Sequence, residues 1–232
     1  MPFGLGNRVF PRDPDFAAKA GPLLDLYHRV WEGAALGADD FVISADEKTS
    51  IQARRRKQPT LPAAANRPTR VEHEYFRGGA WVYLAAWDVH RAKVFGRCES
   101  KNGIAAVDRL VGEVMSQEPY KSARRVFWIM DNCSAHRGQR ADRFRTQWPN
   151  AILIHTPTHA SWLNQVEIYF SIVQRKVLTP NDFSSLADLE QRLLAFQVHY
   201  ERTASPFKWT FTHSDLQALL AKLNAKRLAP AA

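Results

Sequence analysis

The sequence predicts an α/β protein with a mixed sheet flanked by helices, on three observations. Residues 41–45 and 126–130 are short apolar runs, the pattern of strands buried on both faces. Each run is followed directly by an acid, Asp46 and Asp131. Residues 103–117 carry apolar side chains at helical spacing, as expected of the crossover between two parallel strands. Such a crossover is right-handed, so the strands at 41–46 and 125–131 are expected to run parallel.

The N-terminal half is divided by its turn-forming residues. Residues 1–14, rich in Pro and Gly, predict an extended lead-in. Asp15 is the expected N-cap of a helix that runs through Trp31 and is closed by Gly33. Strands are then predicted over 41–46 and, as a partner strand, over 49–57. A proline-containing loop is expected over 58–70, and a hairpin over 79–89 and 92–98.

The C-terminal half alternates strands and helices. After the helix at 103–117, strands are predicted over 125–131 and 151–155, separated by a polar helix over 136–148. A helix over 163–178 carries Glu167 beside an apolar stripe, and terminal helices follow over 186–202 and 214–228. The predicted domains are a linker and N-terminal helix (1–40), a catalytic domain (41–205) and a helical extension (206–232).

Three acids of this pattern are expected to converge. Asp46 and Asp131 follow strands, and Glu167 lies on a later helix. In an open α/β sheet, groups at the carboxyl ends of strands meet in one crevice. Carboxylates that meet repel one another unless cations hold them, so the arrangement predicts divalent metal. Glu47 has a weaker claim, because strand alternation points its side chain to the face opposite Asp46.

Three strings of the sequence carry a family resemblance. They are Ser44-Ala45-Asp46-Glu47-Lys48, Ile129-Met130-Asp131-Asn132-Cys133-Ser134-Ala135-His136 and Ser161-Trp162-Leu163-Asn164-Gln165-Val166-Glu167. These strings resemble the three acidic motifs of DDE transposases, and more narrowly the mariner superfamily and its bacterial branch, the insertion-sequence 630 family. The resemblance is strong over residues 41–177 and looser toward the C-terminus.

The resemblance implies a ribonuclease H-like fold with two bound Mg²⁺ or Mn²⁺ ions. It implies a DNA transposase that cleaves and rejoins strands at the ends of a mobile element, in which Asp46, Asp131 and Glu167 are both catalytic and metal-binding residues. Asp46 is the expected bridging ligand. The nucleophile is a hydroxyl of water or DNA, so no Ser or Cys nucleophile is needed. The expected partner is double-stranded DNA, at element ends and target; a homodimer is one possible assembly.

Weaker candidates for DNA contact surround the acids. A structural role competes at several of them: Asn132 is a turn former, the alternative for His136 is the start of the following helix, and for Trp162 capping of the core is favoured over stacking on DNA. The basic run at 54–57 is expected near the first acid, with alternate side chains facing opposite ways. The full predicted set is Arg54, Arg56, Asn132, His136, Trp162, Asn164, Arg175 and Lys176.

Composition agrees with a DNA-binding protein and excludes several other classes. The chain has a formal net charge of +9 and a pI near 9.8, which favours a polyanionic partner. Its two cysteines, Cys98 and Cys133, lie far apart, which argues against a disulfide scaffold or a zinc site and fits a reducing cytosol. No apolar stretch is long enough to span a membrane. The expected location is the bacterial cytosol, in association with the nucleoid.

The N-terminal segment departs from the family pattern. Full-length relatives carry helix-turn-helix domains before the catalytic domain, whereas only 45 residues precede Asp46. We therefore expect a transposase catalytic domain without those reader domains. Two alternatives remain open: a non-catalytic DNA-binding remnant, and a ribonuclease H-like nuclease that acts on junctions or RNA–DNA hybrids.

Overall fold

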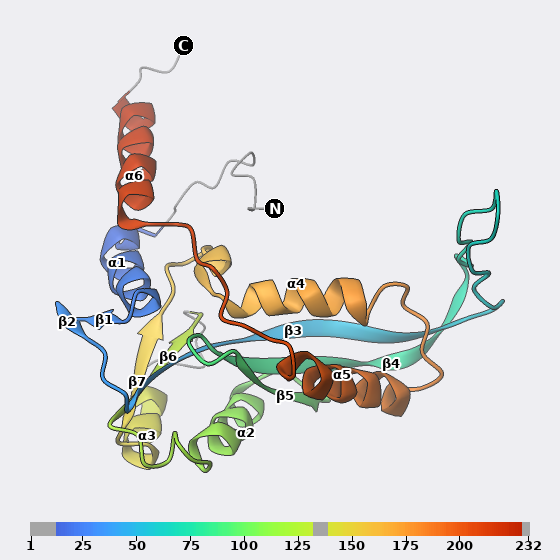
Figure 1. The fold of residues 1–232 in the computed structure, drawn as a ribbon, viewed down its shortest axis with the longest axis horizontal. Coiled ribbons are helices and arrows are strands. Elements are labelled where there is room, and N and C mark those ends of the chain that lie inside the picture. The colour runs from blue at the N-terminus through green and yellow to red at the C-terminus, as the bar shows by residue number, and fades with distance from the viewer. Residues whose placement is uncertain (1–12, 132–138, 229–232) are drawn as a thin grey trace.

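The computed structural model describes residues 13–131 and 139–228, which form a five-stranded mixed sheet with helices on both faces (Figure 1). The strand order is β5-β4-β3-β6-β7. In chain order the main elements are α1 (Phe16–Tyr27), β3 (Asp40–Arg56), β4 (Tyr75–Asp88), β5 (Lys93–Glu99), α2 (Ile104–Met115), β6 (Arg125–Met130), α3 (Gln139–Gln147), β7 (Ala151–His155), α4 (Val166–Lys176), α5 (Leu186–Glu201) and α6 (His213–Leu228). None of the helices within these described ranges combines the length and apolar character that a membrane span requires.

The sheet confirms the predicted parallel neighbours. β3 runs parallel to β6, with Phe41 opposite Val126 and Ser44 opposite Ile129. β7 continues the parallel half, while β4 and β5 pair antiparallel on the other side of β3. The crossover from the β3–β5 meander to β6 is α2, as the helical spacing at 103–117 predicted.

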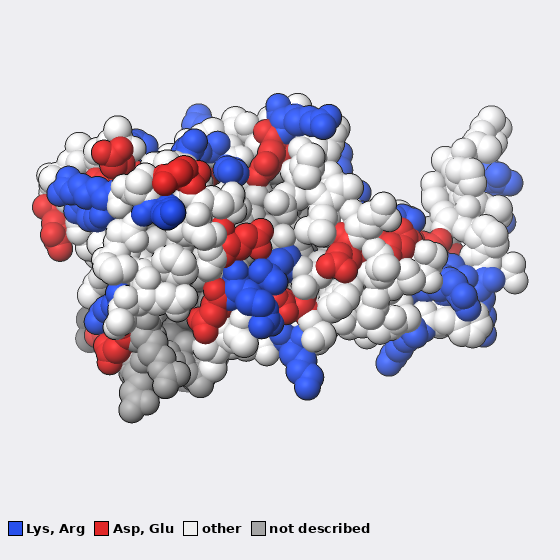
Figure 2. Space-filling model, turned by 90° about the horizontal axis from the view of Figure 1, so that it is seen from below, with Lys and Arg blue, Asp and Glu red and all other residues white. Residues whose placement is uncertain are grey.

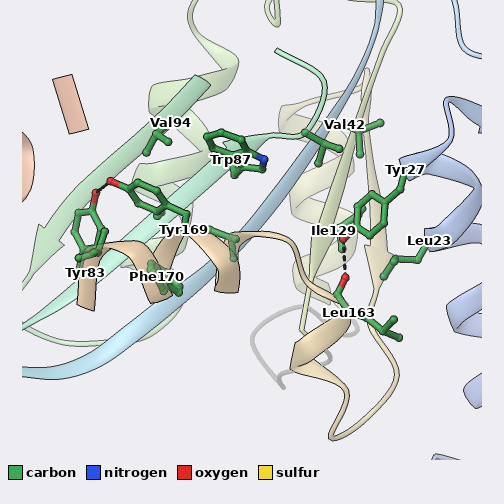
Figure 3. Packing of buried hydrophobic residues seen from close by; sticks show 14 of the residues in the cluster. Leu23, Tyr27, Val42, Tyr83, Trp87, Val94, Ile129, Leu163, Tyr169 and Phe170 are labelled. Atoms are coloured by element: carbon green, nitrogen blue, oxygen red, sulfur yellow. Dashed lines mark hydrogen bonds between the residues drawn. The ribbon is translucent and has the colours of Figure 1, made fainter. Parts of the chain in front are cut away.

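Both faces of the sheet are covered, which explains why the runs at 41–45 and 126–130 are almost wholly apolar. Alternate residues of β3 enter different clusters: Val42 packs with α1 and α4, whereas Ile43 packs with α2. Figure 3 shows the first cluster, in which Trp87 and Tyr169 stack and Tyr83 shares a hydrogen bond with Tyr169. The strands that carry Asp46 and Asp131 are therefore supported from both sides by close-packed side chains.

The first helix ends earlier than predicted. α1 stops at Tyr27, and Val30–Trp31 (β1) pairs with Ala34–Ala35 (β2) in a small hairpin. Arg29 has a φ of 60° and Gly33 a φ of 78°, so the backbone leaves the helical region before Trp31. Asp15 precedes the helix, but its side chain makes no capping hydrogen bond; Asp13 instead accepts from the backbone N–H of Asp15.

The predicted strand break near residue 47 is also absent. β3 is one strand of 17 residues, and it pairs with β4 from Ile43 to Arg56. A register shift between Lys48 and Ile51, with Ser50 at a φ of 54°, bends the strand without ending it. Beyond the bend, β3 and β4 form an arm that projects from the body together with the loop at 57–74 (Figure 1). Residues 181–183 hydrogen-bond along the edge of β3 in this arm.

Candidate active site

Asp46 lies within β3 rather than at its end, just beyond the part of the strand that pairs with β6, and Asp131 directly follows β6. The ladder between β3 and β6 pairs Ser44 with Ile129, and Asp46 and Asp131 each lie two residues further along the chain. Glu167 lies in the first turn of α4, where a carboxylate is favoured by the helix dipole. The carboxylates of Asp131 and Glu167 both raise the pKa of Asp46, so all three acids share one electrostatic environment.

The electrostatics of this cluster favour protonation. Burial raises the pKa of Asp46 to about 8, and the neighbouring carboxylates of Glu47, Asp131 and Glu167 act in the same direction. The pKa of Glu167 is also raised, first by burial, although the ammonium of Lys48 opposes the change. The ionised form of Asp46 is therefore disfavoured, and a pKa perturbed in this way is typical of functional sites.

Glu47 lies on the face of β3 opposite Asp46, as strand alternation predicted, but it interacts electrostatically with the other acids. Burial and the carboxylate of Asp131 raise the pKa of Glu47, and Glu47 in turn raises that of Glu167. The side chain of Asn102 holds it, with Nδ2 donating to Glu47 Oε1 at 2.7 Å. Because Asn102 lies just before α2, this bond places Glu47 on the face of β3 that α2 covers, whereas Asp46 faces Asn164 on the other side.

Asn164 was predicted as a DNA contact, but its side chain is buried, with 1% exposed. Its Nδ2 donates to the backbone oxygen of Ala45 at 3.0 Å and faces Asp46 Oδ2 at 3.4 Å. Its Oδ1 accepts from the hydroxyl of Ser44. Because the Asn164 amide is buried in hydrogen bonds that join the start of α4 to β3, it is not available to contact DNA. The sequence contained one signal of the contact between Ser44 and Asn164: Ser44 is a polar residue inside an apolar strand, and a buried hydroxyl needs a hydrogen-bond partner.

The remaining aromatic and basic candidates are spread over the molecule. Trp162 packs edge-on against Phe211 with ring centroids 5.0 Å apart, which is the core-capping alternative. Arg54 and Arg56 lie on the arm rather than near the first acid; eight residues of strand place Arg54 about 25 Å from Asp46. Arg56 donates to the backbone oxygens of Glu72 and Asn181, so much of its guanidinium is used within the protein.

Arg175 and Lys176 are exposed in the last turn of α4. Helix geometry places Arg175 roughly 80° around the axis from Glu167 and Lys176 on the opposite side of the helix. Asn132 and His136 lie outside the described residues.

The donor chemistry of the cluster fits a divalent cation. Asp46, Glu47, Asp131 and Glu167 offer only carboxylate oxygens, the ligands that Mg²⁺ and Mn²⁺ prefer. The raised pKa of Asp46 marks a place where added positive charge would be stabilising. Within residues 13–131 and 139–228, however, no three Asp, Glu, His or Cys side chains converge closely enough to hold an ion as they stand.

Comparison with known proteins identifies the family. Residues 42–190 match the family described as DDE superfamily endonuclease. The Mos1 mariner paired end complex with Mn superposes with a TM-score of 0.59 at 14% identity, over 97% of this chain and 67% of that chain. The catalytic domain of Mos1 mariner transposase superposes with a TM-score of 0.56 at 12% identity, over 97% of this chain and 98% of that chain. A comparison with curated protein sequences finds no match.

These findings bear on fold and family separately. At such low identity the structural likeness shows the fold, which is the ribonuclease H-like arrangement expected from the order of elements. The sequence match extends over more than half of the chain and includes Asp46, Asp131 and Glu167. The chain therefore belongs to the DDE superfamily endonuclease family.

Proposed function

We propose that this chain is the catalytic domain of a DNA transposase, which cleaves DNA strands and joins them to a target with the help of two divalent cations. The observation that carries the proposal is that three acids lie on neighbouring elements in a family of endonucleases: Asp46 just past the β3–β6 ladder, Asp131 directly after β6 and Glu167 at the start of α4. The Mos1 relatives of the same fold are complexes with paired transposon ends, one with Mn and one with Mg. That likeness supports DNA as the substrate and a divalent metal as the cofactor.

Each acid has a distinct place in the proposed chemistry. Asp46, whose pKa both of the other acids raise, is the proposed bridging ligand, and Asp131 after β6 and Glu167 on α4 are the other proposed ligands. Two bound cations would activate the attacking hydroxyl and stabilise the leaving oxygen of an in-line displacement at phosphorus. Glu47 adds negative charge near these ligands, and the amide of Asn102 donates a hydrogen bond to its carboxylate.

A nicking assay tests this proposal. Wild-type protein is expected to nick supercoiled duplex DNA in Mg²⁺ or Mn²⁺ and to be inactive in EDTA. Asp131→Asn should remove nicking and reduce the metal-induced rise in Tm, because it removes one ligand charge while keeping the side-chain shape. DNA binding without metal-dependent nicking by the wild type would instead identify a non-catalytic remnant. Stronger inhibition by an RNA–DNA hybrid than by duplex DNA would point to a nuclease of hybrids.

Basic side chains offer a path for the DNA backbone. Figure 2 shows Lys and Arg side chains toward the projecting end of the molecule, and the arm carries exposed Arg55, Lys57, Arg67, Arg70 and Arg77. α4 lies along β3 with its C-terminal end toward this arm (Figure 1), so Arg175 lies between Glu167 and the arm. We propose that the phosphate backbone follows this route. We propose further that the chain belongs to the insertion-sequence 630 branch and acts in the bacterial cytosol.

Replacement of Arg175 tests the route. Arg175→Ala is expected to weaken binding to random-sequence duplex and to reduce the slope of log affinity against log salt by about one, since one phosphate contact is lost. Fluorescence anisotropy between about 50 and 200 mM salt measures the slope. Arg124→Ala is the matched control, because exposed Arg124 lies before β6, at the opposite end of that strand from Asp131. Equal slopes for both variants would place the DNA elsewhere.

A further inference from the structure

A buried polar cluster joins the strand that carries Asp46 to the helix that carries Glu167. The start of α4 lacks a local cap, because the side chain of Gln165 makes no capping hydrogen bond. Distant hydroxyls supply the missing partners: Ser44 Oγ accepts from the backbone N–H of Val166 at 2.8 Å, and Tyr27 OH accepts from that of Gln165 at 3.2 Å. The first turn of α4 is therefore anchored on β3 and α1 rather than on its own sequence.

Each hydroxyl also donates its single hydrogen. Tyr27 OH donates to the backbone oxygen of Leu163 at 2.7 Å, the dashed line at the right of Figure 3. Ser44 Oγ accepts from a backbone N–H, which can only donate, so its own hydrogen goes to Asn164 Oδ1. Both hydroxyls thus act once as donor and once as acceptor.

These roles fix the orientation of the Asn164 amide. Because Oδ1 accepts from Ser44, the NH₂ group faces the other way, toward the backbone oxygen of Ala45, which can only accept. The same NH₂ group faces Asp46 Oδ2 at 3.4 Å, while Asp46 Oδ1 accepts from the backbone N–H of Glu47 at 2.8 Å. Both oxygens of the Asp46 carboxylate therefore face N–H groups of fixed position.

We propose that Asn164, oriented by Ser44, is a positioning residue that holds the Asp46 carboxylate and the start of α4 in one frame. Asp46 and Glu167 then present their oxygens together to a divalent cation. The inference rests on the proposed metal-dependent function. It assigns Asn164 no contact with DNA or with the reacting atoms, in agreement with its burial.

The test compares two asparagines that make the same kind of bond. Asn164→Ala removes the positioning amide. Asn150→Ala is the matched control, because Asn150 Nδ2 donates to two backbone oxygens, those of Tyr120 at 2.9 Å and Ala123 at 3.0 Å. Asn150 directly precedes β7, at the end of the parallel strands opposite to the acids. Both variants lose buried hydrogen bonds, so both are expected to lower the Tm.

Metal affinity separates positioning from simple stabilisation. We expect Asn164→Ala to raise the Mn²⁺ concentration for half-saturation by about 10- to 100-fold, the usual cost of losing a partner that orients a ligand. Half-saturation is read from the Tm and from the electron paramagnetic resonance signal of free Mn²⁺. The kcat for nicking should fall and recover partly at high metal, with the KM for DNA unchanged. Asn150→Ala should bind Mn²⁺ like the wild type.

Other outcomes overturn the inference. Equal Mn²⁺ affinity in Asn164→Ala and wild type would leave Asn164 a purely structural role, and a raised KM for DNA with unchanged metal affinity would make it a DNA contact. If Asn164→Ala does not fold, Ser44→Ala replaces it, since loss of the hydroxyl frees the amide to turn; unchanged Mn²⁺ affinity there refutes the inference equally. A wild-type protein that neither binds metal nor nicks DNA refutes the proposed function instead.

Discussion

Asp46→Asn is expected to make the metal-free protein more stable while it removes nicking. The ordinary pKa of this side chain is 3.8, and burial raises it to about 8 in the folded protein. The folded state therefore binds a proton that the unfolded state releases, and stability falls as pH rises from about 4 to about 8. Each pH unit in that window costs about 1.4 kcal/mol, so the relief at pH 7 is on the order of 4 kcal/mol.

Thermal or urea unfolding in EDTA at a series of pH values measures this effect. The Tm difference between Asp46→Asn and wild type should be small near pH 4 and grow toward pH 8. Saturating Mn²⁺ should reverse the order, because only the wild type gains the full binding energy. Asp215→Asn is a control of opposite sign, since hydrogen bonds from Thr212 lower the pKa of that exposed carboxyl. A lower Tm for Asp46→Asn in EDTA at pH 8 would contradict the burial argument.

Arg125→Met is expected to be among the most destabilising single changes. Arg125 donates from Nε at 2.9 Å and Nη2 at 2.7 Å to the carboxylate of Asp40, whose side chain is fully buried. These residues face each other in the first rung of the β3–β6 ladder. Removal of the guanidinium leaves a buried carboxylate without its partner, at a cost of about 3–5 kcal/mol. Urea unfolding at pH 7 measures the loss.

The pH dependence identifies the cause. The bonds from Arg125 lower the pKa of Asp40 to about 2, so this stabilisation is present above pH 3.8 and is lost as pH falls toward 2. The difference between Arg125→Met and wild type should therefore shrink in acid. The control is Arg192→Met, which breaks an exposed pair with Asp188 and should cost no more than about 1 kcal/mol. Equal losses for both variants would show that burial of Asp40 is not what matters.

The sheet and the positions of its acids could be predicted from the sequence because both follow from local patterns of residues. The apolar runs before Asp46 and Asp131 specify strands buried on two faces, and the helical spacing at 103–117 specifies their parallel connection. These patterns do not show where β3 ends, because its bend at Ser50 depends on pairing with β4. Because the patterns predicted a strand break near residue 47, they also placed the basic run near Asp46. The strand is instead continuous and carries Arg54 out onto the arm.

The candidate site was less accessible to prediction than the fold. The positions of Asp46, Asp131 and Glu167 follow from motif and element, and their role as ligands stays a prediction. The setting of these acids depends on contacts between distant segments, such as Ser44 with Val166 and Asn102 with Glu47. Neither contact has a local signature beyond a polar residue in an apolar strand. Strand alternation placed Glu47 on the correct face, but it could not show that Asn102 would bond to it.

The burial of α1 has a consequence for how this catalytic unit can be isolated. Leu23, Leu24 and Leu26 of α1 are fully buried, in the same cluster as Leu163 and Val166 at the acid-bearing end of α4. Residues after α5 close that cluster, among them Phe207, Trp209 and Leu216. The segment matched by the family, residues 42–190, contains every proposed ligand but not these covering side chains. A protein shortened to residues 42–190 would expose the apolar cluster that supports its active site. The segment that folds as a unit is therefore longer than the segment that carries the proposed ligands.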